Sequence, residues 1–73
     1  MAVRNRLKEL RHDHRMNQVE FADYLGVNRQ LYNRWEKQAV QPSLEWVLKI
    51  AKRLGKPVEE IVYLEEEDVE GVE

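Results

Sequence analysis

Apolar side chains recur near the N-terminus of this chain at the spacing of an α-helix. When successive side chains are placed about 100° apart, apolar and polar residues separate onto opposite sides. This pattern predicts a first amphipathic helix that begins at Val3 or Arg4 and ends near Arg15. The apolar side holds Val3, Leu7, Leu10 and His14, and the polar side holds Asn5, Lys8, Glu9 and His12.

Two further short helices are expected on either side of a glycine. Asn17 is a favourable N-cap for a helix Gln18–Leu25, and Gly26 follows it where a left-handed residue ends many helices. Asn28 then caps a third helix, from Arg29 to about Lys37. Two helices joined by so tight a turn predict a helix-turn-helix unit.

The third helix has two faces of different character. Its apolar side carries Leu31, Tyr32 and Trp35. The opposite side is entirely basic or amide, and a charged face of this kind is usually only solvated. Beside a helix-turn-helix turn, however, this face offers the hydrogen-bonding groups that read bases in the major groove of DNA. We therefore interpret it as a surface that contacts DNA. Its members are Arg29, Gln30, Asn33, Arg34 and Lys37.

The last third of the chain predicts two more helices. Ser43 is the expected cap of a fourth helix that Gly55 ends, and Pro57 starts a short fifth helix. Val62–Leu64 fits either a last helical turn or a strand. The sequence therefore predicts an all-α, five-helix domain with a possible short strand near its C-terminus.

The fourth helix is apolar over about 200° of its circumference, which is wider than one core-facing stripe. Trp46 and Ile50 cause the excess. Trp46 is either a large core residue or part of a surface where two chains meet, and we favour the second interpretation. The expected core stripe consists of Leu44, Val47, Leu48, Ala51 and Leu54, and the expected dimer surface of Trp46, Ile50, Val58, Ile61 and Tyr63.

Length and composition limit the possible classes of protein. The 73 residues suffice for one domain, and the absence of cysteine excludes disulfides and thiolate metal sites. His12 and His14 lie about 200° apart on a helix and cannot share a metal ion, and Asp13 and His14 cannot form a catalytic pair. We expect no enzyme activity and no metal, cofactor or small-molecule effector. Without a signal peptide or membrane span, we expect a cytoplasmic protein.

Charge is distributed unevenly along the chain. All 12 lysines and arginines precede Val58, whereas residues 58–73 contain eight acids and no lysine or arginine. A basic body is typical of a domain that binds a polyanion. Residues 65–73 have little apolar content, so we expect a domain at 1–64 followed by a disordered acidic tail at 65–73.

The residues around the turn resemble a known family. The segment Gln18–Gln30, together with Trp35–Glu36, Pro42–Glu45 and Lys49–Lys52, resembles the Cro and phage-repressor (Xre) family of helix-turn-helix regulators. The resemblance extends over about residues 4–62. It implies a five-helix prokaryotic DNA-binding domain that is usually dimeric and is common among repressors and antitoxins.

The resemblance also implies roles for individual residues. It places Gln18 at the edge of the DNA groove and pairs Arg11 with Glu36 in a buried ion pair. It also implies that Arg15 and Gln38, which replace common glycines, adopt positive φ. The base-reading positions are Arg29, Gln30 and Arg34, and those that touch phosphate or base are Asn28 and Asn33.

Two functions remain open at this point. The first is a homodimeric regulator, a repressor by preference, that reads a short palindrome in double-stranded DNA. The second is an antitoxin-like or adaptor module whose main partner is another protein. The second function would be favoured if the chain captured another protein in stoichiometric amounts and bound DNA only weakly by itself.

Overall fold

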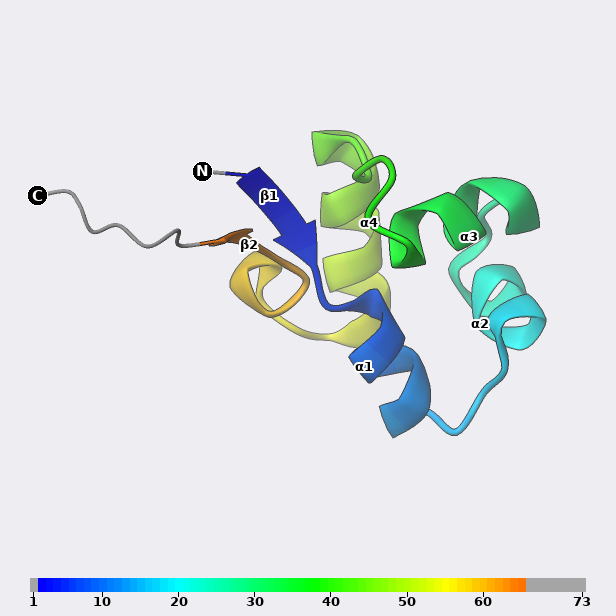
Figure 1. Ribbon diagram of the computed structural model, residues 1–73. Helices are drawn as coiled ribbons and strands as arrows, with labels where there is room; N and C mark the ends of the chain where they lie inside the picture. The colour runs from blue at the N-terminus through cyan, green and yellow to red at the C-terminus, as the bar shows by residue number, and fades with distance from the viewer. Residues whose placement is uncertain (1, 66–73) are drawn as a thin grey trace, which may run out of the picture.

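A computed structural model describes residues 2–65, and within this range it contains four α-helices and a two-stranded antiparallel sheet (Figure 1). None of the described helices has the length and apolar character needed to cross a membrane. The elements in chain order are β1 (Ala2–Asn5), α1 (Leu7–Asp13), α2 (Gln18–Leu25), α3 (Arg29–Glu36), α4 (Leu44–Leu54), the single 3-10 turn η1 (Val58–Glu60) and β2 (Val62–Glu65).

The predicted first helix is confirmed from Leu7 to Asp13, but its predicted start at Val3 or Arg4 is wrong, because the residues before α1 form a strand. β1 pairs antiparallel with β2, and Val3 lies opposite Leu64 while Asn5 lies opposite Val62. The Arg6 amide continues the ladder by donating to the Ile61 carbonyl at 2.9 Å. Periodicity within residues 3–15 cannot reveal a partner about 60 residues away, and this distant pairing decides the conformation.

The C-terminal part differs from the prediction in the same way. The expected fifth helix is only η1, and the ambiguous segment Val62–Leu64 belongs to β2. The prediction of an all-α, five-helix domain is therefore wrong in its helix count and lacks β1, whereas the possible short strand near the C-terminus is confirmed as β2. Glu65, which we placed in the tail, is the last residue of β2. The rest of the predicted acidic tail, residues 66–73, lies outside the described residues.

The helix ends follow the predicted caps closely. α2 begins after Asn17, whose side chain accepts from the Glu20 amide at 2.8 Å while Glu20 accepts from the Asn17 amide at 2.9 Å. It ends at Gly26, with φ 77°. Ser43 and Gly55 likewise bound α4. The boundaries of α2 and α4 predicted from the capping residues are thus confirmed.

The core lies where α1, α2, α3 and α4 meet, and α4 is rotated about its axis from the predicted orientation. Val47 and Ile50 face inward, whereas Leu44 and Leu48, expected in the core stripe, are 73% and 53% exposed. The buried apolar residues are Leu7, Leu10, Phe21, Ala22, Val27, Tyr32, Trp35, Val47, Ile50 and Ile61.

Burial also corrects the predicted dimer surface. Ile50 of α4 and Ile61, which follows η1, are buried in the core of the single chain, so neither is accessible to a second chain. Trp46 is half-buried, packs edge-on against Trp35 with ring centroids 5.6 Å apart, and carries Lys49 over its ring. The remaining two members of that set, Val58 and Tyr63, are also half-buried, and the Arg6 guanidinium covers the Tyr63 ring.

Candidate nucleic-acid interface

The turn between α2 and α3 fixes how α3 lies on the body of the domain. The Gly26 amide donates to the Asp23 carbonyl at 3.1 Å, and the Val27 amide donates to the Ala22 carbonyl at 3.0 Å. Ala22 and Val27 are both buried. A small residue, a left-handed glycine and an inward-pointing valine therefore bring α2 and α3 into close contact.

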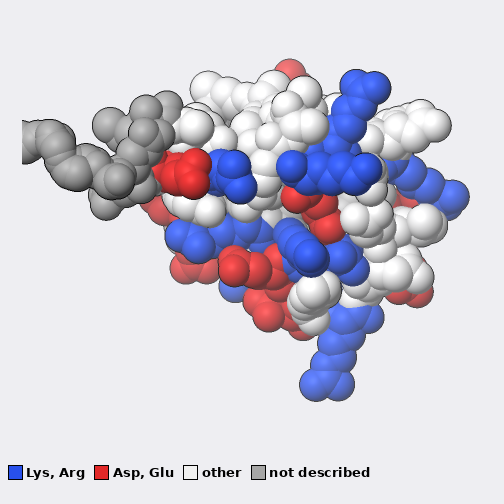
Figure 2. All heavy atoms as spheres, viewed as in Figure 1, with Lys and Arg blue, Asp and Glu red and all other residues white. Residues whose placement is uncertain are grey.

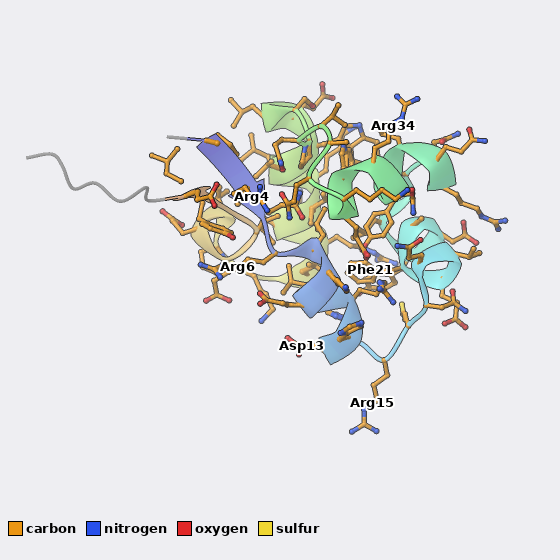
Figure 3. All side chains as sticks on the ribbon, in the orientation of Figure 1. Arg4, Arg6, Asp13, Arg15, Phe21 and Arg34 are labelled. Carbon is orange, nitrogen blue, oxygen red and sulfur yellow. The ribbon has the colours of Figure 1, made fainter. Side chains whose placement is uncertain are left out.

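α3 buries one side and exposes the other, as its sequence predicts. Tyr32 and Trp35 lie in the core, where the Tyr32 ring meets Phe21 edge-on at 5.8 Å. Arg34 projects away from the domain (Figure 3), and basic side chains extend outward around α3 (Figure 2). An open hollow runs along this face, lined by Arg29, Gln30, Asn33, Arg34, Lys37 and Ala39.

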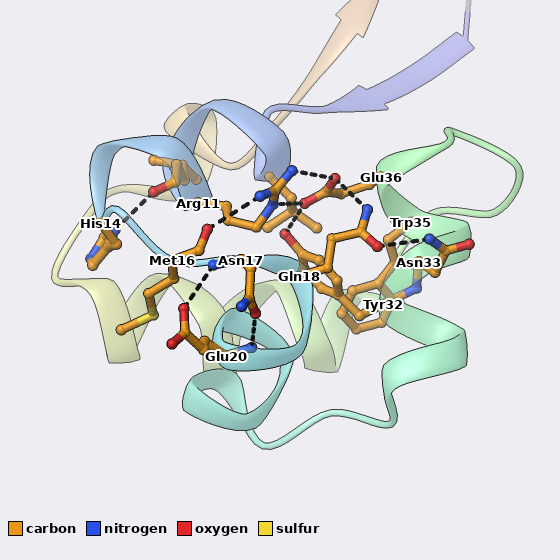
Figure 4. A network of polar contacts seen from close by, with 12 residues as sticks. Arg11, His14, Met16, Asn17, Gln18, Glu20, Tyr32, Asn33, Trp35 and Glu36 are labelled. Carbon is orange, nitrogen blue, oxygen red and sulfur yellow. Dashed lines mark hydrogen bonds and ion pairs between the residues drawn. The ribbon is translucent and has the colours of Figure 1, made fainter.

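The last residue of α3, Glu36, is the centre of a buried polar network (Figure 4). Arg11 of α1 binds its carboxylate with two donors, Nε to Oε2 at 2.6 Å and Nη2 to Oε1 at 3.2 Å. The Tyr32 hydroxyl donates to Oε2, and Gln18 Nε2 donates to Oε1 at 2.9 Å. The side chains of Arg11 and Glu36 are only 13% and 4% exposed. α1, α2 and α3 are therefore joined at one carboxylate.

The network keeps the Glu36 carboxylate charged. Burial alone raises the pKa of Glu36, but hydrogen bonds from Arg11, Tyr32 and Gln18 more than compensate, so its pKa lies below the ordinary value of a glutamate. The hydrogen bond to Glu36 raises the pKa of Arg11, while burial and the neighbouring carboxylate raise the pKa of Tyr32. Each group thus retains the protonation state that the network needs.

Three of the predicted contact residues have their amides oriented by hydrogen bonds within the protein. Asn33 Nδ2 donates to Gln18 Oε1 at 2.9 Å, which links the outer face of α3 to Glu36 through Gln18. Asn28 accepts from the amides of Gln30 and Leu31, so its oxygen is used to cap α3. Gln18 and Asn33 are therefore held together, while Gln30, Arg34 and Lys37 are exposed.

At the N-terminal end of α3 the structure pairs Arg29 with Asp23 of α2, a partner that the sequence analysis missed. Arg29 Nη2 lies 3.0 Å from Asp23 Oδ2, and Nε lies 3.3 Å from Oδ1. This hydrogen-bonded carboxylate raises the pKa of Arg29. Within residues 2–65, Arg34 and Lys37 form no ion pair. The spacing of six residues across the turn could have indicated the Asp23–Arg29 pair.

A second missed feature fastens β1 to the end of α3. Asn5, predicted on a solvated helix face, is 4% exposed and donates to the Trp35 carbonyl at 2.8 Å. Its backbone amide and carbonyl both bond to the side chain of Gln38. As predicted, Gln38 and Arg15 adopt positive φ, 62° and 56°. The side chain of Gln38 thus fixes β1, a role that a glycine could not fill.

Comparison with known proteins places this arrangement in a family. Residues 7–61 match the model of the Helix-turn-helix family. A transcriptional repressor of cryptic phage CTXphi, RstR of Vibrio cholerae, is 38% identical over 58 residues. The match covers 80% of this chain but only 52% of the repressor, so the chain spans about half that relative's length.

Other relatives match along their full length. An uncharacterised HTH-type transcriptional regulator of Methanocaldococcus jannaschii is 38% identical over 66 residues, which is 90% of this chain and 100% of that protein. A similarly described regulator of Bacillus subtilis is 36% identical with the same coverage. The chain therefore belongs to the Cro and phage-repressor (Xre) type of the helix-turn-helix family of DNA-binding transcriptional regulators.

Proposed function

We propose that this chain is a sequence-specific transcriptional repressor that binds double-stranded DNA as a homodimer, with α3 in the major groove. The observation that carries the proposal is the exposed polar face of α3, set on a buried apolar face and anchored at Glu36. Repression is the preferred direction because the Vibrio cholerae relative is named a repressor.

The side chains on α3 suit base edges as well as phosphates. Arginine presents two parallel donors that fit guanine O6 and N7, and glutamine both donates to and accepts from adenine. Arg34 and Gln30 are exposed on the same face and lie along one hollow. Because α3 is held at its C-terminal end by a buried network, it would present these groups with little loss of conformational freedom on binding.

Selection of bound duplexes from a random pool, followed by footprinting, tests this proposal. The wild-type chain should recover a shared palindromic sequence. Arg34→Ala and Gln30→Ala should each weaken binding to that duplex by about 1–3 kcal/mol and weaken binding to a scrambled duplex much less. Lys8→Ala, on α1, is the control for loss of one exposed cation. A pool without a shared sequence would contradict the proposal and favour a protein partner.

The dimer that we propose is centred on α4, at residues that differ from those predicted. Leu44 and Leu48 are four residues apart on the same exposed side, and Val40 is exposed just before them. α4 has Glu45 in its first turn and Lys52 in its last. An antiparallel pairing of two α4 helices about a two-fold axis would therefore oppose the acidic end of one to the basic end of the other.

The proposed dimer surface has a matched test. Leu48→Glu should shift the chain toward monomer in sedimentation and weaken operator binding, because palindrome recognition needs two recognition helices about 34 Å apart. Leu64→Glu is the control, since Leu64 is comparably exposed (59% against 53%) but lies in β2. Dissociation by Leu64→Glu alone would place the contact on the sheet, and a monomeric wild type would contradict the dimer.

A further inference from the structure

We propose that Asp23 is a specificity-determining residue that holds the Arg29 guanidinium in position to read guanine and discourages it from binding phosphate. This inference rests on the proposed function, because it concerns how the same face of α3 distinguishes one DNA sequence from another. The observation that carries it is the two-point contact between Arg29 and Asp23 across the helix-turn-helix turn.

The contact with Asp23 leaves the end of the Arg29 guanidinium available to bind guanine. A guanidinium has five N–H donors, and Asp23 engages Nε and Nη2, which form one side of the group. The end of the group, formed by Nη1 and the second hydrogen of Nη2, retains two parallel donors. Two parallel donors are what guanine O6 and N7 accept. Asp23 can thus hold Arg29 from the side while the end of the guanidinium faces a base.

The position of the pair fits such a role. Asp23 lines an open hollow at the N-terminal end of α3 together with Val27, Asn28, Arg29 and Gln30. Arg29 is the first residue of α3, beside the exposed Gln30 that we expect to contact a base. Asp23 therefore lies at the proposed interface, where its negative charge acts directly on the DNA.

The same carboxylate would penalise the alternative use of Arg29. An arginine that turns toward a phosphate would leave Asp23 unpaired and close to a DNA backbone of like charge. Lys37, which forms no ion pair within the described residues, has no such carboxylate beside it and is available to phosphate. On this face, Asp23 therefore directs Arg29 toward a base and leaves Lys37 for the DNA backbone.

Asp23→Asn tests the inference with two duplexes, the wild-type selected sequence and a scrambled sequence of the same length. The ratio of the two affinities should fall at least about fivefold, the lower limit for one bidentate base contact. On the scrambled duplex, the logarithm of the affinity should depend more steeply on the logarithm of salt concentration, by about one. This change reports one added phosphate contact. The melting temperature of the variant should stay close to that of the wild type, because the side chains of both Arg29 and Asp23 are exposed to solvent.

Two controls separate this role from a general effect of charge. Glu60→Gln also neutralises an exposed acid that is paired with a cation, but it lies in η1. It should change both affinities by the same small factor. In an Arg29→Ala background, Asp23→Asn should no longer change the affinity ratio by more than Glu60→Gln does.

Each alternative result has a distinct meaning. If Asp23→Asn changes both affinities equally, as Glu60→Gln does, Asp23 contributes only general repulsion and the inference is wrong. If it still lowers the ratio without Arg29, Asp23 acts through another group and the inference is again wrong. A wild-type chain that prefers no sequence contradicts the proposed function itself, and with it the inference.

Discussion

The two ends of α3 are each tied to another helix by an arginine and a carboxylate, in very different surroundings. At the C-terminal end, Arg11 and Glu36 are 13% and 4% exposed, and Tyr32 and Gln18 add further hydrogen bonds. At the N-terminal end, the side chains of Arg29 and Asp23 are 61% and 57% exposed, and among the described residues these side chains bond only to each other.

This difference in burial gives the two ion pairs different consequences for folding. A buried charge that loses its partner is left in a medium that solvates it poorly, so the Arg11–Glu36 pair is needed to hold the three helices together. The groups of an exposed ion pair can bind water in place of each other at little cost, so the Arg29–Asp23 pair contributes little to folding. On the proposed function, Arg29 and Asp23 instead remain able to change partners when DNA binds. The same two functional groups would then serve folding at one end of α3 and recognition at the other.

The largest expected effect is at the buried end. Glu36→Ala leaves the buried Arg11 charge without its partner and removes the acceptor of Tyr32 and Gln18, so it should lower the free energy of unfolding by roughly 3–5 kcal/mol. Urea unfolding followed by circular dichroism measures this. An unchanged stability with altered DNA affinity would show that Glu36 serves recognition and would remove the contrast between the two ends.

A smaller effect is expected from one hydrogen bond of the same network. Tyr32→Phe keeps the buried ring but removes the hydroxyl that donates to Glu36, and it should lower the free energy of unfolding by about 1.5–3 kcal/mol, the range for hydrogen bonds to charged groups. The same unfolding measurement applies. No loss of stability would mean that Arg11 and Gln18 alone suffice to satisfy the carboxylate.

Acid should weaken the buried end in a defined direction. The pKa of Glu36 is lower in the folded protein than in the unfolded chain, where it is about 4.3, so the unfolded chain takes up this proton first. The stabilisation is fully present above pH about 4.3 and is lost as the pH falls through the folded pKa. The stability of the wild type should therefore decline more steeply below pH about 4.3 than that of Glu36→Gln. Parallel pH curves would contradict this assignment.

The smallest effect on folding is expected at the exposed end. Asp23→Ala should lower the free energy of unfolding by no more than about 1 kcal/mol, as is usual for surface ion pairs. Glu60→Ala, which removes an acid of similar exposure from η1, should behave alike. A loss at Asp23 comparable to that of Glu36→Ala would make both ends structural and would contradict the contrast.

The parts of the fold that depend on local chemistry could be predicted from the sequence. The bounds of α2 and α4 follow from the caps Asn17 and Ser43 and from the glycines Gly26 and Gly55, each within one turn of the helix it bounds. The polar face of α3 likewise follows from spacing within eight residues. Capping and periodicity are properties of neighbouring residues and need no knowledge of the tertiary structure.

The parts that depend on distant partners could not be predicted. The sequence predicts a helix at the residues of β1, because the partner strand, β2, lies at the other end of the chain. The wide apolar arc of α4 allowed more than one orientation, and packing in the core turned Ile50 inward and Leu48 outward. The contacts of Asn5 with Gln38 and of Asp23 with Arg29 also join separate elements. In each case the sequence shows suitable residues but not which partner they meet.

We propose that the exposed face of α3 is the surface that meets DNA. This can be tested by titrating the isotopically labelled chain with the selected duplex and following its nuclear magnetic resonance spectrum. We expect the largest shifts in α3, including the side-chain amides of Gln30 and Asn33, with η1 and β2 little affected. Shifts concentrated on α4 or the sheet, with α3 unperturbed, would contradict it.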